Sequence, residues 1–512
     1  MEFARLADMS AHWATTTPDK TAILYEGRSE SWAGLHARVL AAAGALRKAG
    51  VKPGDRVGHM GLNHPAHVVL MCACFRLGAI MTPINWRLVA GEVAYVLNDA
   101  GIGLLLADRA FGPVIAGAGV DGLTIVWTDE LDTFLADAEP DARLAPTGPE
   151  TVALQLYTSG TTGFPKGALL TNSNLLGTIA KGALTGESWA VWRDDDVALV
   201  AMPLFHIGGT GWALHALAAG ATMVILPRPD IPAIIAAIAT HRVTRMFAVP
   251  AVLNMILNDP SGSTADFSSV RALLYGASPI PLDVLSRSIA RFPNAQFIQC
   301  YGATETSGTV VYLPPEDHDV AGNARMKGCG KPFPGNEIRI VDADMNELPR
   351  GTIGEIAIRS VSVMAGYHNK PEATAKAIRD GWYLSGDAGT MDSDGYLYIQ
   401  DRVKDMIVSG AENIYPAEVE NALHTHPAVR DAAVIGVPDP KWGEAVKAIV
   451  VLKDGAHATA EDLIAHCRPL IAGYKIPKSV DFVAELPRNP SGKILKKELR
   501  KPYWEGMDRQ VA

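Results

Sequence analysis

Cysteine is scarce in this chain and shows no pairing pattern. The 512 residues include five cysteines, an odd number, and no two of them form a C-x-x-C pair. The five are Cys72, Cys74, Cys300, Cys329 and Cys467. A disulfide framework or a cysteine-based zinc site needs closely spaced and usually even-numbered cysteines. We therefore expect reduced, buried thiols and a cytoplasmic location.

An excess of positive charge is also missing, as is any long apolar run. The formal net charge is −9 at pH 7, whereas proteins that bind nucleic acids are usually basic. The longest apolar runs, 68–75 and 197–205, fall well short of the roughly 18 residues that span a bilayer. Residues 1–5 carry charge at once, unlike a secretory signal. We expect neither a nucleic-acid partner nor a transmembrane segment.

Sustained repeats and low-complexity tracts are absent, and helical and strand-like patterns alternate instead. Residues 31–49 and 64–77 have the pattern of helices, whereas residues 56–60 and 80–83 have the pattern of strands. Alternation of this kind predicts parallel sheets with helices on both faces. In such folds ligands bind where loops leave the carboxyl ends of the strands.

The pattern changes near residue 332. Short alternating segments such as 337–341 and 354–358 predict a small β-rich subdomain. After a charged turn at 400–405 comes a block of about 110 residues, near the usual size of a domain. We expect an α/β protein whose large N-terminal domain, residues 1–401, contains stacked mixed sheets, flanking helices and the β-rich subdomain. A small mobile α+β C-terminal domain, residues 402–512, follows.

One loop carries the strongest chemical signal. It reads Tyr157-Thr-Ser-Gly-Thr-Thr-Gly-Phe-Pro-Lys-Gly167 and follows an apolar, strand-like segment. Glycines let the backbone approach an anion, N–H groups and hydroxyls donate to it, and Lys166 adds a point charge. A proline before the lysine and a glycine after it distinguish the loop from the common P-loop. The composition suits the phosphates of ATP.

Further motifs follow in a fixed order through nearly the whole chain. They are Pro203-Leu-Phe-His206, Tyr275-Gly-Ala-Ser278, Tyr301-Gly-Ala-Thr-Glu305, Tyr383-Leu-Ser-Gly-Asp387, Asp401-Arg-Val-Lys-Asp-Met-Ile407, Ser409-Gly-Ala-Glu-Asn413 and Pro487-Arg-Asn-Pro-Ser-Gly-Lys493. Together with the loop at 157–167, they make the chain resemble the adenylate-forming superfamily of acyl-CoA synthetases, peptide-synthetase adenylation domains and luciferases.

The resemblance implies an ATP site. Glu305 would hold Mg²⁺, which prefers oxygen ligands and bound phosphates, and Thr162 is a second candidate ligand. Thr304 would contact the α-phosphate, while Asp387 and Arg402 would bind the ribose. The other residues expected to bind the nucleotide are Thr158, Ser159, Gly160, Thr161, Lys166, Gly276, Ala277, Ser278, Tyr301 and Gly302.

The resemblance also assigns a catalytic lysine and a hinge. Lys493 would lie between the carboxylate and the α-phosphate, where a compact ammonium can bridge two oxygens. Lys404 would be the hinge about which the C-terminal domain rotates between two half-reactions. Bacterial relatives are acetylated on the matching lysine, so a lysine acetyltransferase acting on Lys493 would remove its charge.

Two segments are expected near the thiol of CoA. After the rotation, Ser409, Gly410 and Ala411 would line the path of the pantetheine arm, and Trp442 lies in a Lys-Trp-Gly-Glu stretch common among CoA-forming relatives. Many relatives have glycine where this chain has Ala411, so the extra methyl group is expected to narrow that path slightly.

The acyl pocket follows from the same resemblance. His206 would orient the acid at the pocket mouth, with Cys300 as part of the wall rather than a nucleophile. The other expected pocket residues are Gly208, Gly209, Trp212 and Val249. These segments contain no arginine or lysine to pair with a second carboxylate, which disfavours dicarboxylates such as malonate. A medium- or long-chain fatty acid, or an aryl or branched acid, fits better.

The sequence therefore predicts an ATP-dependent acid–thiol ligase that forms an acyl-AMP and then an acyl-CoA. An adenylation-only ligase that passes the acyl-AMP to a carrier protein is the alternative, although no inserted segment or fused carrier domain favours it. A nucleotide-binding regulatory protein without catalysis is disfavoured because Lys166, Glu305, Asp387 and Lys493 are all present. Relatives are often dimers, which leaves a homodimer open.

Overall fold

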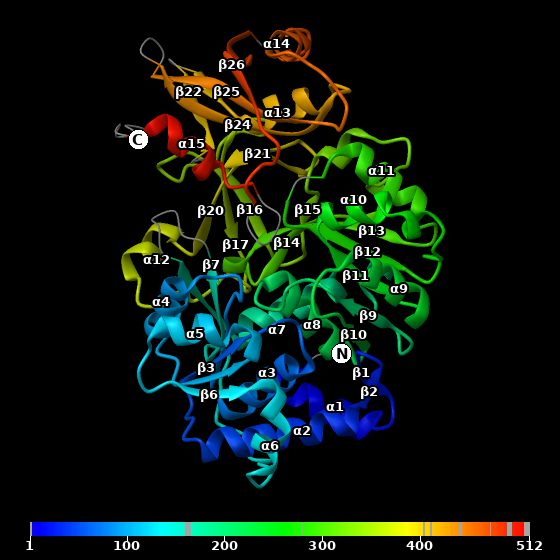
Figure 1. Cartoon of the computed structure of the whole chain (residues 1–512), viewed down its shortest axis with the longest axis vertical. Coiled ribbons are helices and arrows are strands. Elements are labelled where there is room, and N and C mark those ends of the chain that lie inside the picture. The colour runs from blue at the N-terminus through cyan, green and yellow to red at the C-terminus, as the bar shows by residue number, and fades with distance from the viewer. Residues whose placement is uncertain are drawn as a thin grey trace. The chain divides into compact units, whose positions relative to one another are not determined.

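The computed structural model describes residues 3–158, 165–278, 280–402, 405–409, 412–439, 443–471, 473–488 and 494–505. The backbone divides into two compact units (Figure 1). The first unit comprises Met1–Glu337 and Ile358–Tyr383, and the second comprises Ile338–Ala357 and Leu384–Ala512. The functional boundary expected at 401–402 stays a prediction. Its hinge, Lys404, lies outside the described residues.

The first unit contains a nine-stranded sheet in the order β15-β14-β13-β12-β11-β9-β10-β1-β2. The six strands from β13 to β1 in this order are parallel to their neighbours, and β14, β15 and β2 are antiparallel additions at the two edges. The strands are β1 Thr21–Tyr25, β2 Arg28–Ser31, β9 Val197–Val200, β10 Thr222–Ile225, β11 Arg245–Ala248, β12 Ala272–Gly276, β13 Gln296–Ala303, β14 Gly308–Leu313 and β15 Lys331–Pro332.

A second, seven-stranded sheet of the same unit has the order β18-β8-β7-β4-β3-β5-β6. Strands β7, β4, β3, β5 and β6 run parallel, and β8 and β18 are antiparallel additions. The strands are β3 Arg56–Met60, β4 Ile80–Pro83, β5 Leu104–Ala107, β6 Thr124–Trp127, β7 Val152–Thr158, β8 Lys166–Thr171 and β18 Gly366–Tyr367. The strands predicted at 56–60 and 80–83 are confirmed.

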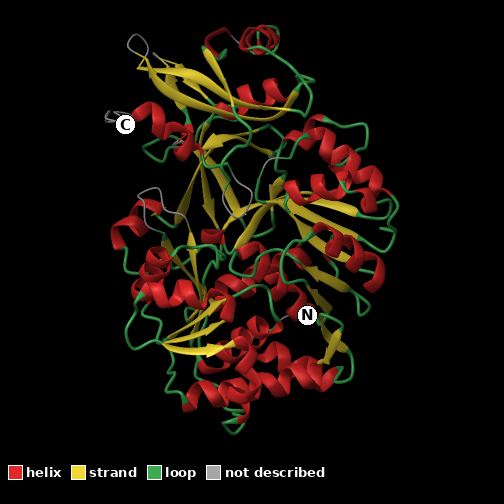
Figure 2. Ribbon diagram, viewed as in Figure 1, coloured by secondary structure: helices red, strands yellow, loops and turns green. Residues whose placement is uncertain are grey.

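Helices flank both sheets (Figure 2). The helices of the first unit are α1 Met9–Thr16, α2 Trp32–Lys48, α3 Pro65–Leu77, α4 Ala90–Ala100, α5 Gly112–Ala118, α6 Leu131–Ala136, α7 Asn172–Leu184, α8 Ile207–Ala219, α9 Ile231–His241, α10 Pro250–Asn258, α11 Leu282–Arg291 and α12 Pro371–Ala377. The helices predicted at 31–49 and 64–77 are confirmed as α2 and α3. No helix within the described ranges is both long and apolar enough to cross a membrane.

The boundaries of α2 and α3 have local causes. The Ser31 hydroxyl accepts a hydrogen bond from the Gly34 amide, which satisfies an otherwise unpaired donor in the first turn of α2. The His64 ring accepts from the Ala66 amide at the start of α3, and Pro65 occupies the first helical position. Helix α3 then ends at Gly78, whose φ of 65° is in the left-handed region that glycine adopts without strain.

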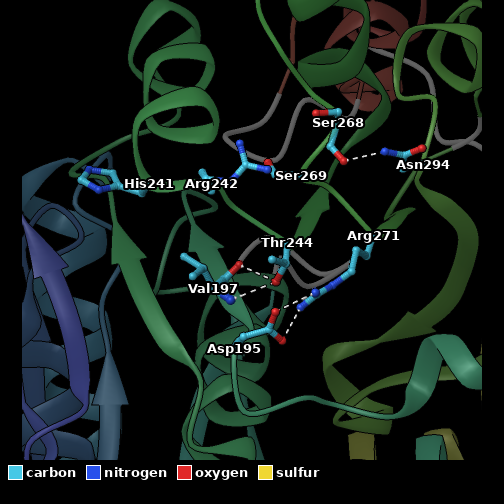
Figure 3. Close-up of a pocket in the computed structure, with 9 residues that line it drawn as sticks. All are labelled: Asp195, Val197, His241, Arg242, Thr244, Ser268, Ser269, Arg271 and Asn294. Carbon is cyan, nitrogen blue, oxygen red and sulfur yellow. Dashed lines mark hydrogen bonds and ion pairs between the residues drawn. The ribbon is translucent and has the colours of Figure 1, made fainter.

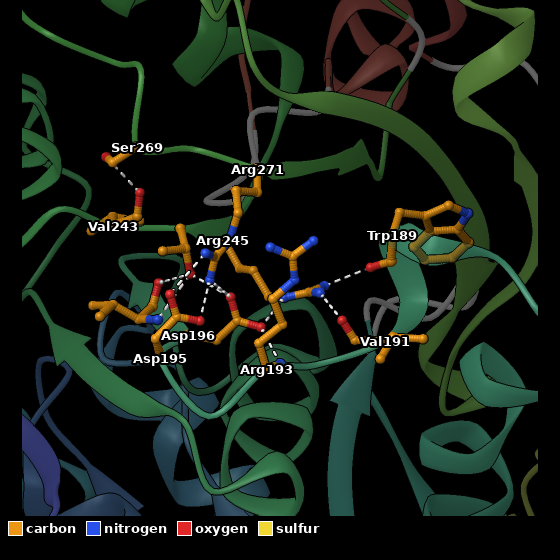
Figure 4. A network of polar contacts seen from close by, with 11 residues as sticks. Trp189, Val191, Arg193, Asp195, Asp196, Val243, Arg245, Ser269 and Arg271 are labelled. Carbon is orange, nitrogen blue, oxygen red and sulfur yellow. Dashed lines mark hydrogen bonds and ion pairs between the residues drawn. The ribbon is translucent and has the colours of Figure 1, made fainter.

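A buried ion pair ties together the amino ends of three neighbouring strands (Figure 4). The Asp196 carboxylate, just before β9, is 2.6 Å from Nε of Arg245 in β11 and 2.7 Å from Nη2 of Arg271, just before β12. The Thr244 hydroxyl also donates to Asp196. Burial would raise the pKa of Asp196, but the Arg245 charge and these hydrogen bonds hold it below its ordinary value.

The second unit contains most of a third sheet and all of a fourth, while β19 and the first two residues of β20 belong to the first unit. In the third sheet β16, β17 and β20 are neighbours, β21 pairs with β20, and the short β19 pairs with the start of β20. Their bounds are β16 Glu337–Val341, β17 Gly354–Arg359, β19 Ile378–Arg379, β20 Trp382–Met391 and β21 Leu397–Arg402. The β-rich segment predicted after residue 332 is therefore confirmed, and most of it belongs to the same compact unit as the C-terminal residues.

The last sheet has the order β23-β22-β25-β24, with β26 parallel to β25. Its strands and the helices that follow residue 415 are β22 Ile407–Ser409, β23 Glu412–Ile414, α13 Pro416–His424, β24 Val429–Asp439, β25 Gly443–Leu452, α14 Ala460–Cys467, β26 Ser479–Phe482 and α15 Lys496–Trp504. This mixture of helices and strands is the α+β architecture expected for the C-terminal region.

Candidate active site

The expected functional residues of the first unit cluster at one edge of the nine-stranded sheet. Parallel strands β13, β12, β11 and β9 are neighbours, so their carboxyl ends meet at that edge. Thr304 and Glu305 follow β13, Gly276 ends β12, Val249 follows β11, and His206 ends the segment after β9. Motifs spread over 100 residues of sequence are thus brought to one edge of one sheet.

Glu305 is the centre of a polar cluster. Its Oε1 accepts a hydrogen bond of 3.1 Å from Oγ1 of Thr158 and one of 2.8 Å from the hydroxyl of Tyr367. Lys166 is paired with Thr158 across β7 and β8, and its Nζ lies 4.9 Å from the centre of the Tyr367 ring. The cluster therefore joins the end of β7, the start of β8, β18 and the turn after β13.

Sequence reasoning missed Tyr367. No nucleotide motif includes it, and it reaches Glu305 because the two-residue strand β18 pairs with β8, which lies about 200 residues earlier in the chain. The register places Tyr367 opposite Ala168, two residues beyond Lys166. Only the tertiary structure reveals this residue, since strand pairing brings Tyr367 to Glu305.

The chemistry of this cluster fits a magnesium ion. Glu305 is only 9% exposed, and its Oε2 makes no hydrogen bond to any residue in the described part of the chain. A carboxylate oxygen and the Thr158 hydroxyl are hard oxygen donors of the kind that Mg²⁺ prefers. The described residues contain no group of three or more histidine, cysteine or carboxylate side chains that could hold a metal by themselves. Mg²⁺ usually binds through one or two carboxylates together with phosphates and water.

The expected nucleotide loops depend on two close backbone approaches. A Cβ on Gly276 would lie 2.1 Å from the carbonyl oxygen of Cys300, and a Cβ on Gly302 would lie 1.9 Å from that of Gly308. Only glycine fits at either position. Ala277 has a φ of 67°, an uncommon left-handed conformation for a residue with a side chain. Strain of this kind concentrates at functional sites.

His206 has a ring nitrogen with no hydrogen-bond partner among the described residues. Its Nε2 is enclosed and makes no hydrogen bond to a described residue, although the ring as a whole is partly exposed. Burial and the nearby charge of Arg87 lower the pKa of His206 to about 4. The ring is therefore neutral at pH 7. Arg87 is a second residue that sequence reasoning missed, because it lies outside the segments expected to form the pocket.

The other expected pocket residues contact neighbouring elements of the sheet. A Cβ on Gly208 would lie 3.1 Å from the Phe247 ring, and a Cβ on Gly209 would lie 2.1 Å from the carbonyl oxygen of Pro203. The Trp212 indole donates to the Leu199 carbonyl at 2.9 Å. Burial raises the pKa of the Cys300 thiol to about 12, so the thiolate that a nucleophile needs is not formed at neutral pH.

In the second unit, strand pairing brings expected partners together. Asp387 on β20 lies opposite Arg402 on β21, the two residues expected to bind the ribose. Ser409 on β22 lies opposite Gly443 on β25, which directly follows the expected CoA residue Trp442. Several expected site residues lie outside the described residues, namely Ser159, Gly160, Thr161, Thr162, Lys404, Gly410, Ala411, Trp442 and Lys493.

A separate hollow lies at the other end of the parallel strands of the nine-stranded sheet. An open hollow of about 510 Å³ is lined by residues at the amino ends of the same strands, including Asp195, Thr244 and Arg271 (Figure 3). Arg271 is held by two hydrogen bonds to Asp195. Ligands of parallel α/β sheets bind at the carboxyl ends, so this hollow at the opposite edge is not the active site.

Comparison with known proteins identifies the family of this chain. The family model described as AMP-binding enzyme matches residues 10–368, and that described as AMP-binding enzyme C-terminal domain matches residues 418–493. A feruloyl-CoA synthase of an Amycolatopsis species is 42% identical over 492 residues, which cover 96% of this chain and 97% of that protein. The fatty acid–[acyl-carrier-protein] ligase ScoC of Streptomyces coeruleorubidus is 39% identical over 511 residues, covering 99% and 98%.

A solved structure of a CoA synthetase also matches this chain over nearly its whole length. The o-succinylbenzoate CoA synthetase MenE of Bacillus subtilis, in complex with ATP and a magnesium ion, superposes with a TM-score of 0.85 at 32% identity, covering 96% of this chain and 99% of that one. The chain belongs to the family of AMP-binding enzymes. The predicted membership in the adenylate-forming superfamily and the predicted fold class are confirmed, and within the family the chain is an AMP-forming acid–thiol ligase.

Proposed function

We propose that the chain uses ATP and Mg²⁺ to activate an aryl or branched acid, or a medium- or long-chain fatty acid, and transfers the acyl group to CoA. A carboxylate oxygen of the acid attacks the α-phosphorus, and the bond to pyrophosphate breaks. The CoA sulfur then attacks the acyl carbon and AMP leaves. The polar cluster around Glu305 is the observation that carries this proposal.

The first step brings two anions together, so it depends on positive charge and preorganised donors more than on a base. Thr158 and Lys166 stand at the two ends of the loop proposed to bind the phosphates, and both belong to the cluster around Glu305. Magnesium bound by Glu305 would neutralise charge on the phosphates. Thr304 follows β13 next to Glu305, which suits a hydrogen bond to the α-phosphate.

His206 is proposed to orient the acid. Its neutral ring has an enclosed Nε2 that no described residue contacts by a hydrogen bond, which suits a hydrogen bond to a substrate oxygen. Phe205, whose ring lies 4.5 Å from that of His206, and Phe247 beside Gly208 supply apolar surface for an aryl or alkyl group. Arg87 adds a cation near His206, so acids with a second carboxylate belong in the substrate test.

The second unit is proposed to contribute the remaining groups. The pairing of Asp387 with Arg402 supports a joint role at the ribose, and the pairing of Ser409 with Gly443 supports a shared role of their two segments near CoA. Lys493 is proposed to bridge the carboxylate and the α-phosphate, with rotation about Lys404 between the half-reactions. Acetylation of Lys493 would stop adenylation and spare the thioester step.

A CoA-dependent AMP-release assay over a carboxylate panel tests the proposal. The panel includes fatty acids of increasing length, benzoate, ferulate, indoleacetate and malonate. We expect turnover with one class of acid whose reacting carboxylate is its only charge, and a loss of about 100-fold or more in Glu305→Gln. Glu30→Gln is the matched control, because Glu30 is a part-buried carboxylate of β2 that pairs with Arg38. Equal activity of the two variants would refute the role of Glu305.

Transfer to a carrier protein is the second candidate, and the likeness to ScoC favours it. In that case pyrophosphate release needs only ATP and the acid, and CoA does not stimulate AMP release. Acyl transfer to the phosphopantetheine thiol of a carrier protein would then replace transfer to CoA. If Ala411 limits access of CoA, Ala411→Gly increases CoA-dependent AMP release; if the chain serves a carrier protein, the same change leaves that rate at background.

A further inference from the structure

A series of buried hydrogen bonds connects β3 to the segment that ends at His206. Nδ1 of His59 lies 3.1 Å from Nδ1 of His67 in α3, and Nε2 of His67 lies 3.1 Å from Oγ1 of Thr210 in α8. The Thr210 hydroxyl in turn donates to the carbonyl of Leu204. His59, His67, Thr210 and Leu204 are all buried.

The donor and the acceptor of each hydrogen bond in this buried series can be assigned. A carbonyl can only accept, so Thr210 donates to Leu204 and must accept from His67. His67 therefore carries its hydrogen on Nε2. Burial lowers the pKa values of both histidines, that of His59 to about 4, so both rings are neutral. A neutral His67 has a bare Nδ1, so His59 must donate to it from its own Nδ1.

Asn63 holds the same segment from another side. Its amide nitrogen donates to the carbonyls of Met202 at 3.1 Å and Leu226 at 3.0 Å, and its amide oxygen accepts from the Leu204 amide at 2.9 Å. Both backbone polar groups of Leu204 are therefore held by buried side chains. We call residues 201–206 the gate segment. Gly209 lets α8 approach it closely, since a Cβ there would lie 2.1 Å from the Pro203 carbonyl oxygen.

We propose that Thr210 and His67 are positioning residues for the acid substrate. They fix Leu204, and the two following residues, Phe205 and His206, extend from it into the proposed acid site. This inference rests on the proposed role of His206. A constellation that recognises a substrate needs its supporting groups locked by hydrogen bonds and packing. Loss of the Thr210 hydroxyl leaves the buried Leu204 carbonyl without a donor among the described residues, so the gate segment must shift to satisfy it.

The kinetic test uses three substitutions. Thr210→Val keeps the shape of the side chain and removes the hydroxyl, while Thr210→Ser restores it. Thr82→Val is the matched control, because Thr82 in β4 is fully buried and its hydroxyl has no hydrogen-bond partner among the described residues. We expect Thr210→Val to lower kcat/KM for the acid about tenfold or more, since small misplacements of reacting groups have large effects.

The same variant should keep the KM for ATP within about twofold of the wild-type value, because ATP is proposed to bind at the polar cluster around Glu305 and not at the gate segment. Thr210→Ser should recover to within about threefold of the wild type. A purely structural role predicts equal losses toward acid and ATP, and either that result or identical behaviour of Thr210→Val and Thr82→Val would overturn the proposal. Thr210→Ala makes the same comparison if the valine variant does not fold.

Hydrogen exchange supplies a measurement that does not depend on activity. In Thr210→Val the amides of Leu204, His206 and Gly209 should exchange faster, whereas Thr82→Val should leave them unchanged. If the wild type activates no acid, the proposed function fails, and the exchange result still decides whether Thr210 positions the gate segment. Unchanged exchange at these three amides in Thr210→Val would refute the positioning role.

Discussion

We expect the buried amine of Lys181 to make this enzyme more stable as the pH rises from about 7 to 10.5. The side chain, on α7, is 3% exposed, and its Nζ donates to the Thr309 carbonyl at 3.2 Å and to the Ser362 hydroxyl at 2.5 Å. Two acceptors match the two N–H groups of a neutral amine. No ion pair to Lys181 occurs within the described residues. Burial lowers the pKa of Lys181 from 10.5 to about 7.

The magnitude follows from proton linkage. A lowering of the pKa from 10.5 to about 7 corresponds to about 5 kcal/mol of free energy. Below pH 7 the amine is charged in both states and the folded state carries the full cost. Between pH 7 and 10.5 the unfolded state binds more protons, so the free energy of unfolding rises with pH. Above 10.5 the amine is neutral in both states and the cost is gone.

Lys181→Met removes this titration and fills the site with an unbranched apolar side chain. The variant also loses two hydrogen bonds, but that loss does not change with pH. Between about pH 7.5 and about pH 9.5, we therefore expect the free energy of unfolding of the wild type to rise by about 2.5 kcal/mol relative to the variant. Equilibrium guanidinium unfolding at the two pH values measures it.

The matched control is Lys52→Met, since Lys52 is an exposed lysine of the same unit. The free energy of unfolding of Lys52→Met should differ from that of the wild type by the same amount at both pH values, to within about 0.5 kcal/mol. The reasoning is refuted if the free energies of unfolding of the wild type and Lys181→Met also differ by the same amount at both pH values. Lys181 would then keep its ordinary protonation in the folded state.

Three further substitutions test the site and the fold. Gly302→Ala places a Cβ 1.9 Å from a backbone oxygen and should lower pyrophosphate release about 100-fold. Tyr367→Phe removes one of the two hydrogen bonds to Oε1 of Glu305 and should raise the Mg²⁺ concentration needed for half-maximal pyrophosphate release about tenfold. Arg245→Met leaves Asp196 buried without its main partner and should lower the free energy of unfolding by about 3–5 kcal/mol, measured by guanidinium unfolding.

Each of these substitutions has a control of the same chemistry. Gly148→Ala meets open space, Tyr474→Phe alters a side chain that is 45% exposed, and Arg109→Met removes an arginine whose side chain is 49% exposed. All three should stay within about 0.5 kcal/mol of wild-type stability and about twofold of wild-type activity. A site or core variant that behaves like its control would contradict the role assigned to that residue.

The sequence predicted the class of enzyme, and it proposed the site residues, because the relevant signals are local. The loop at 157–167 places glycines, hydroxyls and a lysine within a few residues, which suits the phosphates of a nucleotide, and the strings around Ser278, Glu305 and Asp387 carry the resemblance to the family. Helix and strand periodicity predicted α2, α3, β3 and β4 closely. A helical pattern depends on residues three or four positions apart, and a strand pattern depends on residues two positions apart.

Other features were decided only by the tertiary structure. Tyr367 reaches Glu305 through the pairing of β18 with β8, and Arg87 comes near His206 although no expected pocket segment contains it. Lys181 looks like an ordinary lysine in the sequence, yet the fold buries it without a carboxylate partner among the described residues. Burial, the pKa and partners far along the chain depend on which surfaces pack together, and no local pattern of residues carries that information.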